Sequence, residues 1–333
     1  MLAALLCCLL PSDPLSVYFI DVEGGGAMLV VSPEGESMLV DSGYPDLGSR
    51  DLKRILRVVK DVADLDRIDH AVVTHWHRDH YGNHAALAAE LPIGRFLDRG
   101  IPDALQEDPE FEPRIADYRR ASENESIALA AGDDFALAGG VSVRVLAASR
   151  SVVSGGEPNP YASEHTARDR DNSDNAESLA MVIEHGDFRL FCGGDLTWNV
   201  EADLVTPGNP IGSIDLYMVT HHGLPTSNNP VLVKAVEPVV AVMCNGPSKG
   251  GQPDVLATLA ALPTLKAWFQ LHTNLSVPPE KQTKRSRIAN TGDTASCSGR
   301  FIRVTHTAGD NEFAVQIEGS EPERFSTHAS AAK

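Results

Sequence analysis

The sequence is poor in cysteine, short of basic side chains and without an apolar run long enough to cross a membrane. Its five cysteines form neither a Cys-x-x-Cys pair nor a disulfide framework. Lysine and arginine number 28 against 46 acidic residues, for a formal charge of −18. Because nucleic-acid binders usually present a basic surface, a long nucleic acid is disfavoured and a small-molecule substrate is expected. Bound divalent metals can still hold a phosphate against this negative field.

An apolar run, Leu2 to Leu10, opens the chain and ends at Pro11. It resembles the core of a secretory signal, although the charged start and a clear cleavage site are missing. We therefore expect residues 1–15 to be a signal-like segment of a protein exported to the periplasm or the outside. A mis-assigned start or a buried N-terminal strand in a cytoplasmic protein is the alternative. Residues 16–333 should form one domain, and its oligomeric state is left open.

Short apolar runs bounded by turn residues predict a β meander over residues 16–43 and a further strand over 71–74. Apolar positions on one face predict a helix from Asp51 to Val62 with Ser49 as its cap, and Asn83 is expected to cap the next helix. Residues 149–173 form a long polar loop of the kind that often serves as a lid. Later strands are predicted over residues 141–146, 179–184, 188–191, 214–220, 239–243, 267–271, 301–305 and 313–317.

Three histidines and an aspartate directly follow the strand that ends at Thr74, in the order His75, His77, Asp79 and His80. Imidazole and carboxylate are the usual ligands of zinc and similar ions. Alternate residues of an irregular loop can turn the same way. His75 and His77 can therefore share one metal while Asp79 and His80 reach a second, which predicts a binuclear site.

Matching ligands follow two later strands. Asp195 comes after a strand and two glycines, which permit close approach of the backbone to a metal. His221 and His222 come after another strand. Since neighbouring residues at a strand end point in opposite directions, we expect only one of these two histidines to be a direct ligand.

The sequence resembles the metallo-β-lactamase superfamily. The matching pieces, in the order typical of that family, are Leu39-Val-Asp41-Ser-Gly43, His75-x-His77-x-Asp79-His80, Gly194-Asp195 and His221-His222-Gly223. Phe19-Ile-Asp21-Val22 with its glycine run is similar to the branch that includes the hydrolase domain of competence (DNA-uptake) proteins. The resemblance implies a four-layer αββα sandwich and one or two zinc ions, with manganese or iron as alternatives.

The same resemblance implies that Asp41 supports the histidine loop. It also implies a third histidine for the first metal, about one hairpin before Asp195. That region holds Asp174 and Asn175 instead, so we predict Asn175 as the ligand there, with His165 of the preceding loop as the alternative.

A metal-bound hydroxide is the expected nucleophile, oriented by Asp79 and Asp195 as the catalytic carboxylates. Asn228, Asn245 and Lys249 follow strand ends and are candidates for substrate contact. His272 is a candidate for stabilising the leaving group, or else a structural histidine. The predicted function is hydrolysis of a phosphodiester. The alternatives are a lactone or β-lactam hydrolase and, in another class, a non-catalytic metal-binding protein.

Overall fold

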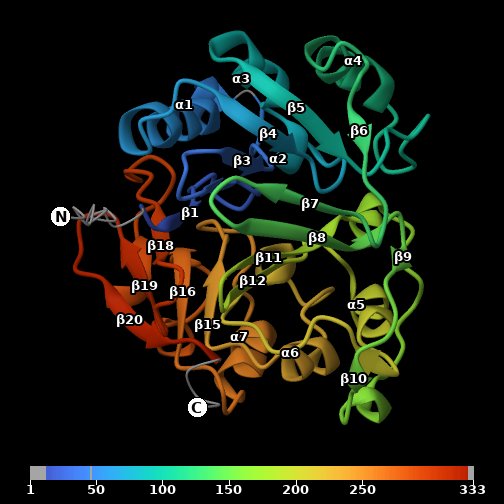
Figure 1. The fold of residues 1–333 in the computed structure, drawn as a ribbon, viewed down its shortest axis with the longest axis vertical. Coiled ribbons are helices and arrows are strands. Elements are labelled where there is room, and N and C mark those ends of the chain that lie inside the picture. The colour runs from blue at the N-terminus through green and yellow to red at the C-terminus, as the bar shows by residue number, and fades with distance from the viewer. Residues whose placement is uncertain (1–12, 46, 329–333) are drawn as a thin grey trace, which may run out of the picture.

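The structure is a computed structural model that describes residues 13–45 and 47–328. Two large mixed sheets lie face to face, with helices on both outer surfaces (Figure 1). This arrangement is the predicted four-layer αββα sandwich. Residues 1–12, which hold most of the predicted signal-like segment, lie outside the described residues. Within the part of the chain that is described, no helix combines the length and the apolar character that a membrane span requires.

The first sheet joins both ends of the described chain, because β1 pairs antiparallel with β2 on one side and with β18 on the other. Its strands, from one edge to the other, are β20 (Glu323–Ser326), β19 (Glu312–Ile317), β18 (Ile302–His306), β1 (Leu15–Phe19), β2 (Met28–Val31), β3 (Ser37–Val40), β4 (Ile68–Val72), β5 (Ile93–Asp98) and β6 (Ile127–Ala128). The strands from β3 to β6 run parallel.

The second sheet has a parallel half and an antiparallel half. Its strands in order are β17 (Ile288–Asn290), β16 (Ala267–His272), β15 (Val240–Met243), β14 (Leu216–Met218), β12 (Phe188–Cys192), β11 (Ala180–His185), β8 (Val141–Ala148) and β7 (Asp134–Leu137), with β9 (Ser151–Val152) beside β8. Strands β10 (Glu157–Pro158) and β13 (Gly208–Asn209) form a separate pair.

Three apolar clusters fill the spaces between the four layers. The central cluster lies between the sheets and includes Val17, Val145 and Leu190, all without exposed surface or nearly so. One outer cluster packs under α1 (Arg50–Leu56), α3 (His84–Glu90) and α4 (Phe111–Ala121). The other packs under α5 (Trp198–Leu204), α6 (Pro230–Val236) and α7 (Pro253–Ala260).

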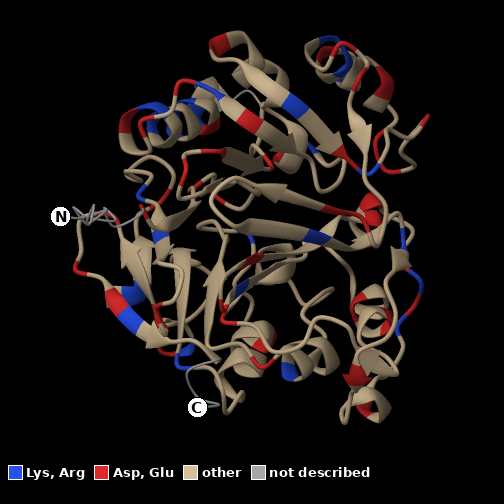
Figure 2. Cartoon of the chain, viewed as in Figure 1, with Lys and Arg blue, Asp and Glu red and all other residues tan. Residues whose placement is uncertain are grey.

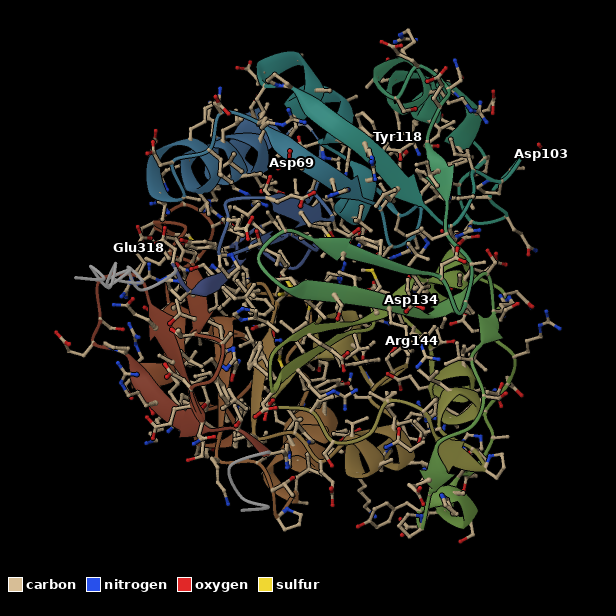
Figure 3. All side chains as sticks on the ribbon, in the orientation of Figure 1. Asp69, Asp103, Tyr118, Asp134, Arg144 and Glu318 are labelled. Atoms are coloured by element: carbon tan, nitrogen blue, oxygen red, sulfur yellow. The ribbon has the colours of Figure 1, made fainter. Side chains whose placement is uncertain are left out.

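Charged residues gather on the outer helices and loops, and the inner strands carry few of them (Figure 2). At the edge of the second sheet, Asp134 and Arg144 on neighbouring strands lie 3.9 Å apart (Figure 3). The interior is therefore held mainly by apolar burial.

Local details of the helices differ from the sequence predictions. The helix predicted over residues 51–62 consists of α1 and a π-helical continuation, Arg57–Val62. Ser49 makes no capping hydrogen bond because its backbone is left-handed. Asn83 does not cap α3 either, since its side-chain amide donates to the carbonyls of Ser42 and Tyr44. The Asn83 side chain is thus engaged by the loop at residues 42–44 instead of by the helix.

The carboxyl ends of several strands meet at one edge of the sandwich. In the parallel pair of β12 and β14, Cys192 stands opposite Met218. Asp195 and His221 each lie three residues further on, so this register brings them level. The backbone N–H of Leu179 donates to the carbonyl of Thr74 at 2.9 Å, which ties the histidine loop of the first sheet to the second. The loops that carry the predicted ligands therefore converge.

Candidate metal centre

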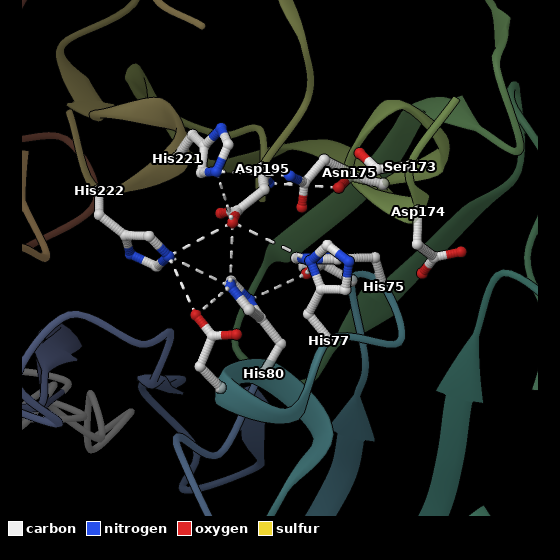
Figure 4. A network of polar contacts seen from close by, with 12 residues as sticks. His75, His77, His80, Ser173, Asp174, Asn175, Asp195, His221 and His222 are labelled. Atoms are coloured by element: carbon white, nitrogen blue, oxygen red, sulfur yellow. Dashed lines mark hydrogen bonds and ion pairs between the residues drawn. The ribbon is translucent and has the colours of Figure 1, made fainter. Parts of the chain in front are cut away.

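Asp195 is the middle of a buried group of histidine rings (Figure 4). Its Oδ2 lies 3.3 Å from Nε2 of His80 and 3.3 Å from Nε2 of His222. The same oxygen lies 3.4 Å from Nε2 of His221 and 3.8 Å from Nε2 of His75. One carboxylate thus faces imidazoles from both sheets.

Two overlapping sets of donor atoms share Asp195. In the first, Nε2 of His75 lies 3.2 Å from Nδ1 of His77. In the second, Oδ2 of Asp79 is 3.5 Å from Nε2 of His80 and 3.5 Å from Nε2 of His222. The donor atoms of Asp79, His80, Asp195 and His222 all lie within 4.8 Å of one another, and all four residues are buried. His75 therefore lies beside His77, and Asp79 and His80 lie beside Asp195 and His222.

The structure corrects the expectation that His221 and His222 point in opposite directions. Both residues have left-handed backbones, with φ of 52° for His221 and 56° for His222. Opposite orientation of neighbours is a property of extended strands, and β14 ends at Met218, three residues before His221. Both rings consequently face Asp195.

Each ring nitrogen turned away from the centre has an oxygen partner, as is usual for metal-binding histidines. Nδ1 of His80 lies 2.7 Å from Oδ2 of Asp41, and Nε2 of His77 lies 3.1 Å from Oε1 of Glu107. The remaining contacts join Nδ1 of His75 to the Thr74 hydroxyl at 3.0 Å, Nδ1 of His221 to the Ser227 hydroxyl at 3.0 Å, and Nδ1 of His222 to the Cys244 carbonyl at 3.2 Å. These contacts fix the orientation of all five rings.

The protonation states suit a cation. Burial favours the neutral form of Asp195, but His222, His80 and His221 outweigh it and hold the pKa of Asp195 well below its usual range. Burial lowers the pKa of His221 to about 4 and that of His75 well below its ordinary value. Anionic carboxylates and neutral imidazoles are the forms that bind metals.

His80 behaves differently. Burial lowers its pKa, yet Asp195, Asp41 and Asp79 together raise it well above the ordinary value. The three carboxylates therefore favour positive charge at this ring. A divalent cation beside Nε2 would meet the same attraction in place of the proton.

Asn175 carries an observation of its own. Its Oδ1 is buried and has no hydrogen-bond partner, while its Nδ2 is 3.4 Å from Nε2 of His221. A buried carbonyl oxygen without a donor is costly unless something positive contacts it. Asn175 therefore fits the position of an oxygen ligand. The alternative, His165, is placed elsewhere, with Nδ1 3.1 Å from the amide of Asn229.

Lys249 lies at the rim of the centre. Its Nζ is 2.5 Å from Oδ2 of Asp79 and 3.3 Å from the hydroxyl of Tyr44. Burial lowers the pKa of Lys249, but Asp79 and Asp195 outweigh it and raise that pKa above its ordinary value. The side chain keeps 30% of its surface exposed, so a cationic group faces both the centre and solvent.

Three other predicted contacts are corrected. Asn228 is buried and donates to the carbonyls of Thr220 and Leu224, and Asn245 donates to the carbonyls of Gly246 and His272. These amides are engaged with the backbone and shape the loops. His272 lies with Asp21 and Cys297, and is not among the residues around Asp195. None of the three side chains is therefore placed to contact a substrate or a leaving group at this centre.

Sequence reasoning missed the residues that support the histidine loop. Glu107 contacts His77 and also accepts the backbone N–H of Asp174 at 2.6 Å. The Asp174 carboxylate accepts the backbone N–H of Trp76 at 2.5 Å and pairs with Arg99. Glu107 lies in an acidic stretch without regular pattern, and nothing in the sequence marked it. Asp174 could have been noticed, because it precedes Asn175 in the region where the third ligand of the first metal was expected.

The donor set fits a divalent metal ion. Imidazole nitrogens and carboxylate oxygens at these separations are typical of zinc, and also of manganese or iron. The unsatisfied Oδ1 of Asn175 and the orienting partners of the five rings point the same way. The site is a metal-site candidate assembled from both sheets.

Residues 21–156 match the family model of the metallo-beta-lactamase superfamily. That part of the chain carries the superfamily's sequence pattern, and the fold is its αββα sandwich. No curated protein matches the chain.

Several solved structures are similar to the chain. CmlA, a diiron beta-hydroxylase from Streptomyces venezuelae, is 18% identical over 71% of this chain and 45% of that chain, with a TM-score of 0.42. A protein from Parabacteroides distasonis, provisionally described as a metal-dependent hydrolase, is 12% identical over 75% of this chain and 91% of that chain, with a TM-score of 0.44. An archaeal metallo-beta-lactamase superfamily protein from Sulfolobus tokodaii is 15% identical over 56% of this chain and 64% of that chain, with a TM-score of 0.30. The chain spans about half the length of the CmlA structures.

Proposed function

We propose that this chain is a metal-dependent hydrolase of the metallo-β-lactamase superfamily that cleaves small phosphodiesters. The observation that carries the proposal is the convergence of four imidazoles on the single carboxylate of Asp195. Burying and orienting so many polar groups costs free energy of folding, which a function in binding a catalytic metal explains.

Zinc is the proposed ion, with manganese or iron as alternatives. His75, His77, Asp195, His221 and Asn175 would hold a first ion, and Asp79, His80, Asp195 and His222 a second. When bound, such an ion lowers the pKa of a coordinated water to about 7 and polarises the bond under attack.

The side chains of the centre have separate tasks. Asp195, shared by both sets, orients the attacking water through its carboxylate. Asp79 holds the second set and also pairs with Lys249. Because the Lys249 ammonium group faces solvent as well, it can contact a non-bridging oxygen of the substrate and offset negative charge that develops there.

Lys249 also supports the choice of substrate. The chain carries a formal charge of −18, so a cation at the rim of the centre is a local exception. A phosphodiester is an anion, whereas a simple lactone is not. The resemblance of Phe19-Ile-Asp21-Val22 to competence proteins favours a phosphodiester too, and the acidic surface favours a small one.

The test is a panel of chromogenic phosphodiester, phosphonate, lactone and cephalosporin substrates, assayed with zinc or manganese. We expect diester cleavage that chelation abolishes and metal restores. His77→Ala and Asp195→Ala should abolish it with the fold retained, while His70→Ala, in the middle of β4 where His70 contacts Glu36, serves as the matched control. Turnover of lactones or cephalosporins alone would select the alternative hydrolase. No turnover by the metal-loaded protein would select a metal-binding role.

A second measurement tests whether Lys249 recognises an anionic substrate. Replacing Lys249 by alanine should raise KM for the diester roughly 10-fold, the value of one charge-assisted hydrogen bond, while Lys249→Arg retains most of the affinity. An equal rise for an uncharged ester would contradict recognition of an anion.

A further inference from the structure

A second group of metal-binding side chains lies apart from the centre at Asp195. It consists of Asp21, Glu23, His272 and Cys297, whose donor atoms all lie within 4.8 Å of one another. Asp21 and Glu23 follow β1, His272 ends β16, and Cys297 belongs to the segment before β18. Three parts of the chain that are distant in sequence therefore bring carboxylate, imidazole and thiol groups together.

The separations suit a small cation. Sγ of Cys297 is 3.1 Å from Oδ2 of Asp21 and 3.2 Å from Nε2 of His272. Nε2 of His272 is 3.5 Å from Oδ2 of Asp21. In a tetrahedral zinc site with bonds of about 2.0 to 2.3 Å, ligand atoms lie roughly 3.3 to 3.7 Å apart. The three groups need to move by only a few tenths of an ångström to bind one ion.

His272 is held in place by this group. Its side chain is fully buried and its Nδ1 has no hydrogen-bond partner, so the ring is fixed through Nε2 alone. Hydrogen bonding explains the arrangement poorly. The Cys297 sulfur already accepts the backbone N–H of Gly299 at 3.3 Å. The buried Nδ1 of His272 stays unused, and a buried polar atom without a partner costs free energy.

The charged side chains around this group carry a net negative charge that a cation can neutralise. Arg54 contacts Oδ2 of Asp21 and Oε1 of Glu23, each at 3.0 Å, and Arg50 contacts Oε2 of Glu23 at 2.8 Å. Arg50 also pairs with buried Asp51. Two guanidinium groups thus stand against three carboxylates. A divalent ion with the Cys297 thiolate brings the group to neutrality, since four negative groups then balance the ion and the two arginines.

We propose that Asp21, His272 and Cys297 bind a zinc ion, distinct from the centre around Asp195. Both oxygens of Glu23 are engaged by arginines and by the Thr294 hydroxyl, so Glu23 lies around the ion and a water takes the fourth position. Binding converts the thiol to a thiolate, and the released proton goes to solvent. Carboxylate, imidazole and thiolate are all zinc donors, and three protein ligands with one water complete a four-coordinate site.

Such an ion would act on the catalytic centre through the backbone. The glycine run follows Asp21 by three residues, and the N–H of Gly26 donates to the carbonyl of Asp79 at 2.9 Å. A side chain at Gly25 would place its Cβ 2.5 Å from that carbonyl, so the two segments are in close contact. The ion would fix Asp21, and so the start of the segment 21–26 that contacts the backbone of Asp79.

Cobalt substitution tests the proposal directly. A thiolate bound to Co²⁺ gives an intense charge-transfer absorption in the near ultraviolet, which nitrogen and oxygen ligands do not give. We expect this band in the cobalt-loaded full chain, its loss in Cys297→Ser, and its retention in His77→Ala and in the control Cys244→Ser. Metal content should fall by about one equivalent per chain in Cys297→Ser. A wild-type protein without the band, or a Cys297→Ser variant that keeps it, overturns the proposal.

A measurement on wild-type protein alone covers the case in which Cys297→Ser fails to fold. Cys297 is partly exposed, so an alkylating reagent can reach it. Zinc-loaded protein should label at Cys297 at least roughly 10-fold more slowly than chelated protein, as peptide mass spectrometry would show. Equal labelling rates in the two forms would mean that no ion binds this cysteine. Neither readout depends on hydrolysis, so failure here leaves the proposed function standing.

Discussion

The carboxylate of Asp41 holds Nδ1 of His80 at 2.7 Å and accepts the backbone N–H and the hydroxyl of Thr74, each at 2.8 Å. Asp41 therefore orients the His80 ring and the end of the strand that precedes the histidine loop at the same time. Its backbone is left-handed, with φ of 61°, a conformation that few residues other than glycine, asparagine and aspartate adopt. The loop geometry and the side-chain chemistry both select this residue type.

Replacing Asp41 by asparagine should weaken metal binding about 10- to 100-fold, because His80 loses the anionic partner that fixes its ring. Asparagine tolerates the same backbone conformation, so the fold is retained. Competition with a chromogenic chelator measures the affinity. Asp69→Asn, at the start of β4 where Asp69 bonds to Ser37, is the control and should bind metal as wild type does. Equal affinities of Asp41→Asn and wild type would contradict the orienting role.

Asn175 provides the second prediction. An amide oxygen is a weaker zinc ligand than imidazole, so Asn175→His should raise zinc affinity by about 10-fold. Turnover can fall even so, because the amide is lost. Calorimetric zinc titration of the apo proteins makes the comparison. His165→Ala is the control and should bind zinc as wild type does. Unchanged affinity in Asn175→His together with lost binding in His165→Ala would place the ligand on the preceding loop.

Glu201 provides a prediction about pH. It is buried under the loop that carries His221 and accepts the backbone N–H groups of Asn228 and Asn229. Burial, only partly offset by these hydrogen bonds, raises its pKa from 4.5 to about 7. The folded state thus binds this proton more tightly than the unfolded chain. The resulting stabilisation is complete below pH 4.5 and is lost as the pH rises through 7.

Wild type should therefore lose about 2.5 kcal/mol of unfolding free energy relative to Glu201→Gln between pH 5 and pH 8. Glutamine stays neutral throughout and supplies one acceptor oxygen instead of two. Urea unfolding at several pH values gives the difference. Glu184→Gln, which alters a partly exposed pair with Arg189, should show no such trend. A difference between wild type and Glu201→Gln that does not change with pH would sink the assignment.

The N-terminal segment gives a fourth prediction. The first strand begins at Leu15, so removal of residues 1–13 should leave solubility and activity unchanged. Sedimentation and the diester assay on the shortened chain check this. Precipitation of the shortened protein would instead indicate that the segment belongs to the core and is not a signal.

Much of the centre could be predicted because its information is local. His75, His77, Asp79 and His80 fall within six residues, directly after an apolar run that reads as a strand. Their spacing and residue types suffice to predict metal binding, whatever the rest of the chain does. The four-layer αββα sandwich is an expectation from the resemblance to the metallo-β-lactamase superfamily, because the strand and helix signals by themselves predict individual elements and not their layering.

Other features depended on conformations that residue types do not reveal. Both rings of the histidine pair face Asp195 because residues 221 and 222 adopt left-handed backbones, which strand geometry does not predict. Asn228 and Asn245 follow strand ends as substrate-binding residues often do. Their side-chain amides nevertheless donate hydrogen bonds to neighbouring backbone carbonyls. These contacts depend on the conformation of each loop.

The group formed by Asp21, His272 and Cys297 was decided by tertiary structure alone. Its members are 251 and 25 residues apart in the chain, and no short motif contains two of them. They meet because β18 pairs with β1 in one sheet while β16 belongs to the other, so that the two sheets bring the ends of these strands to one place. Strand pairing over such separations depends on packing of the whole sandwich, and the residue pattern around each side chain carries no trace of it.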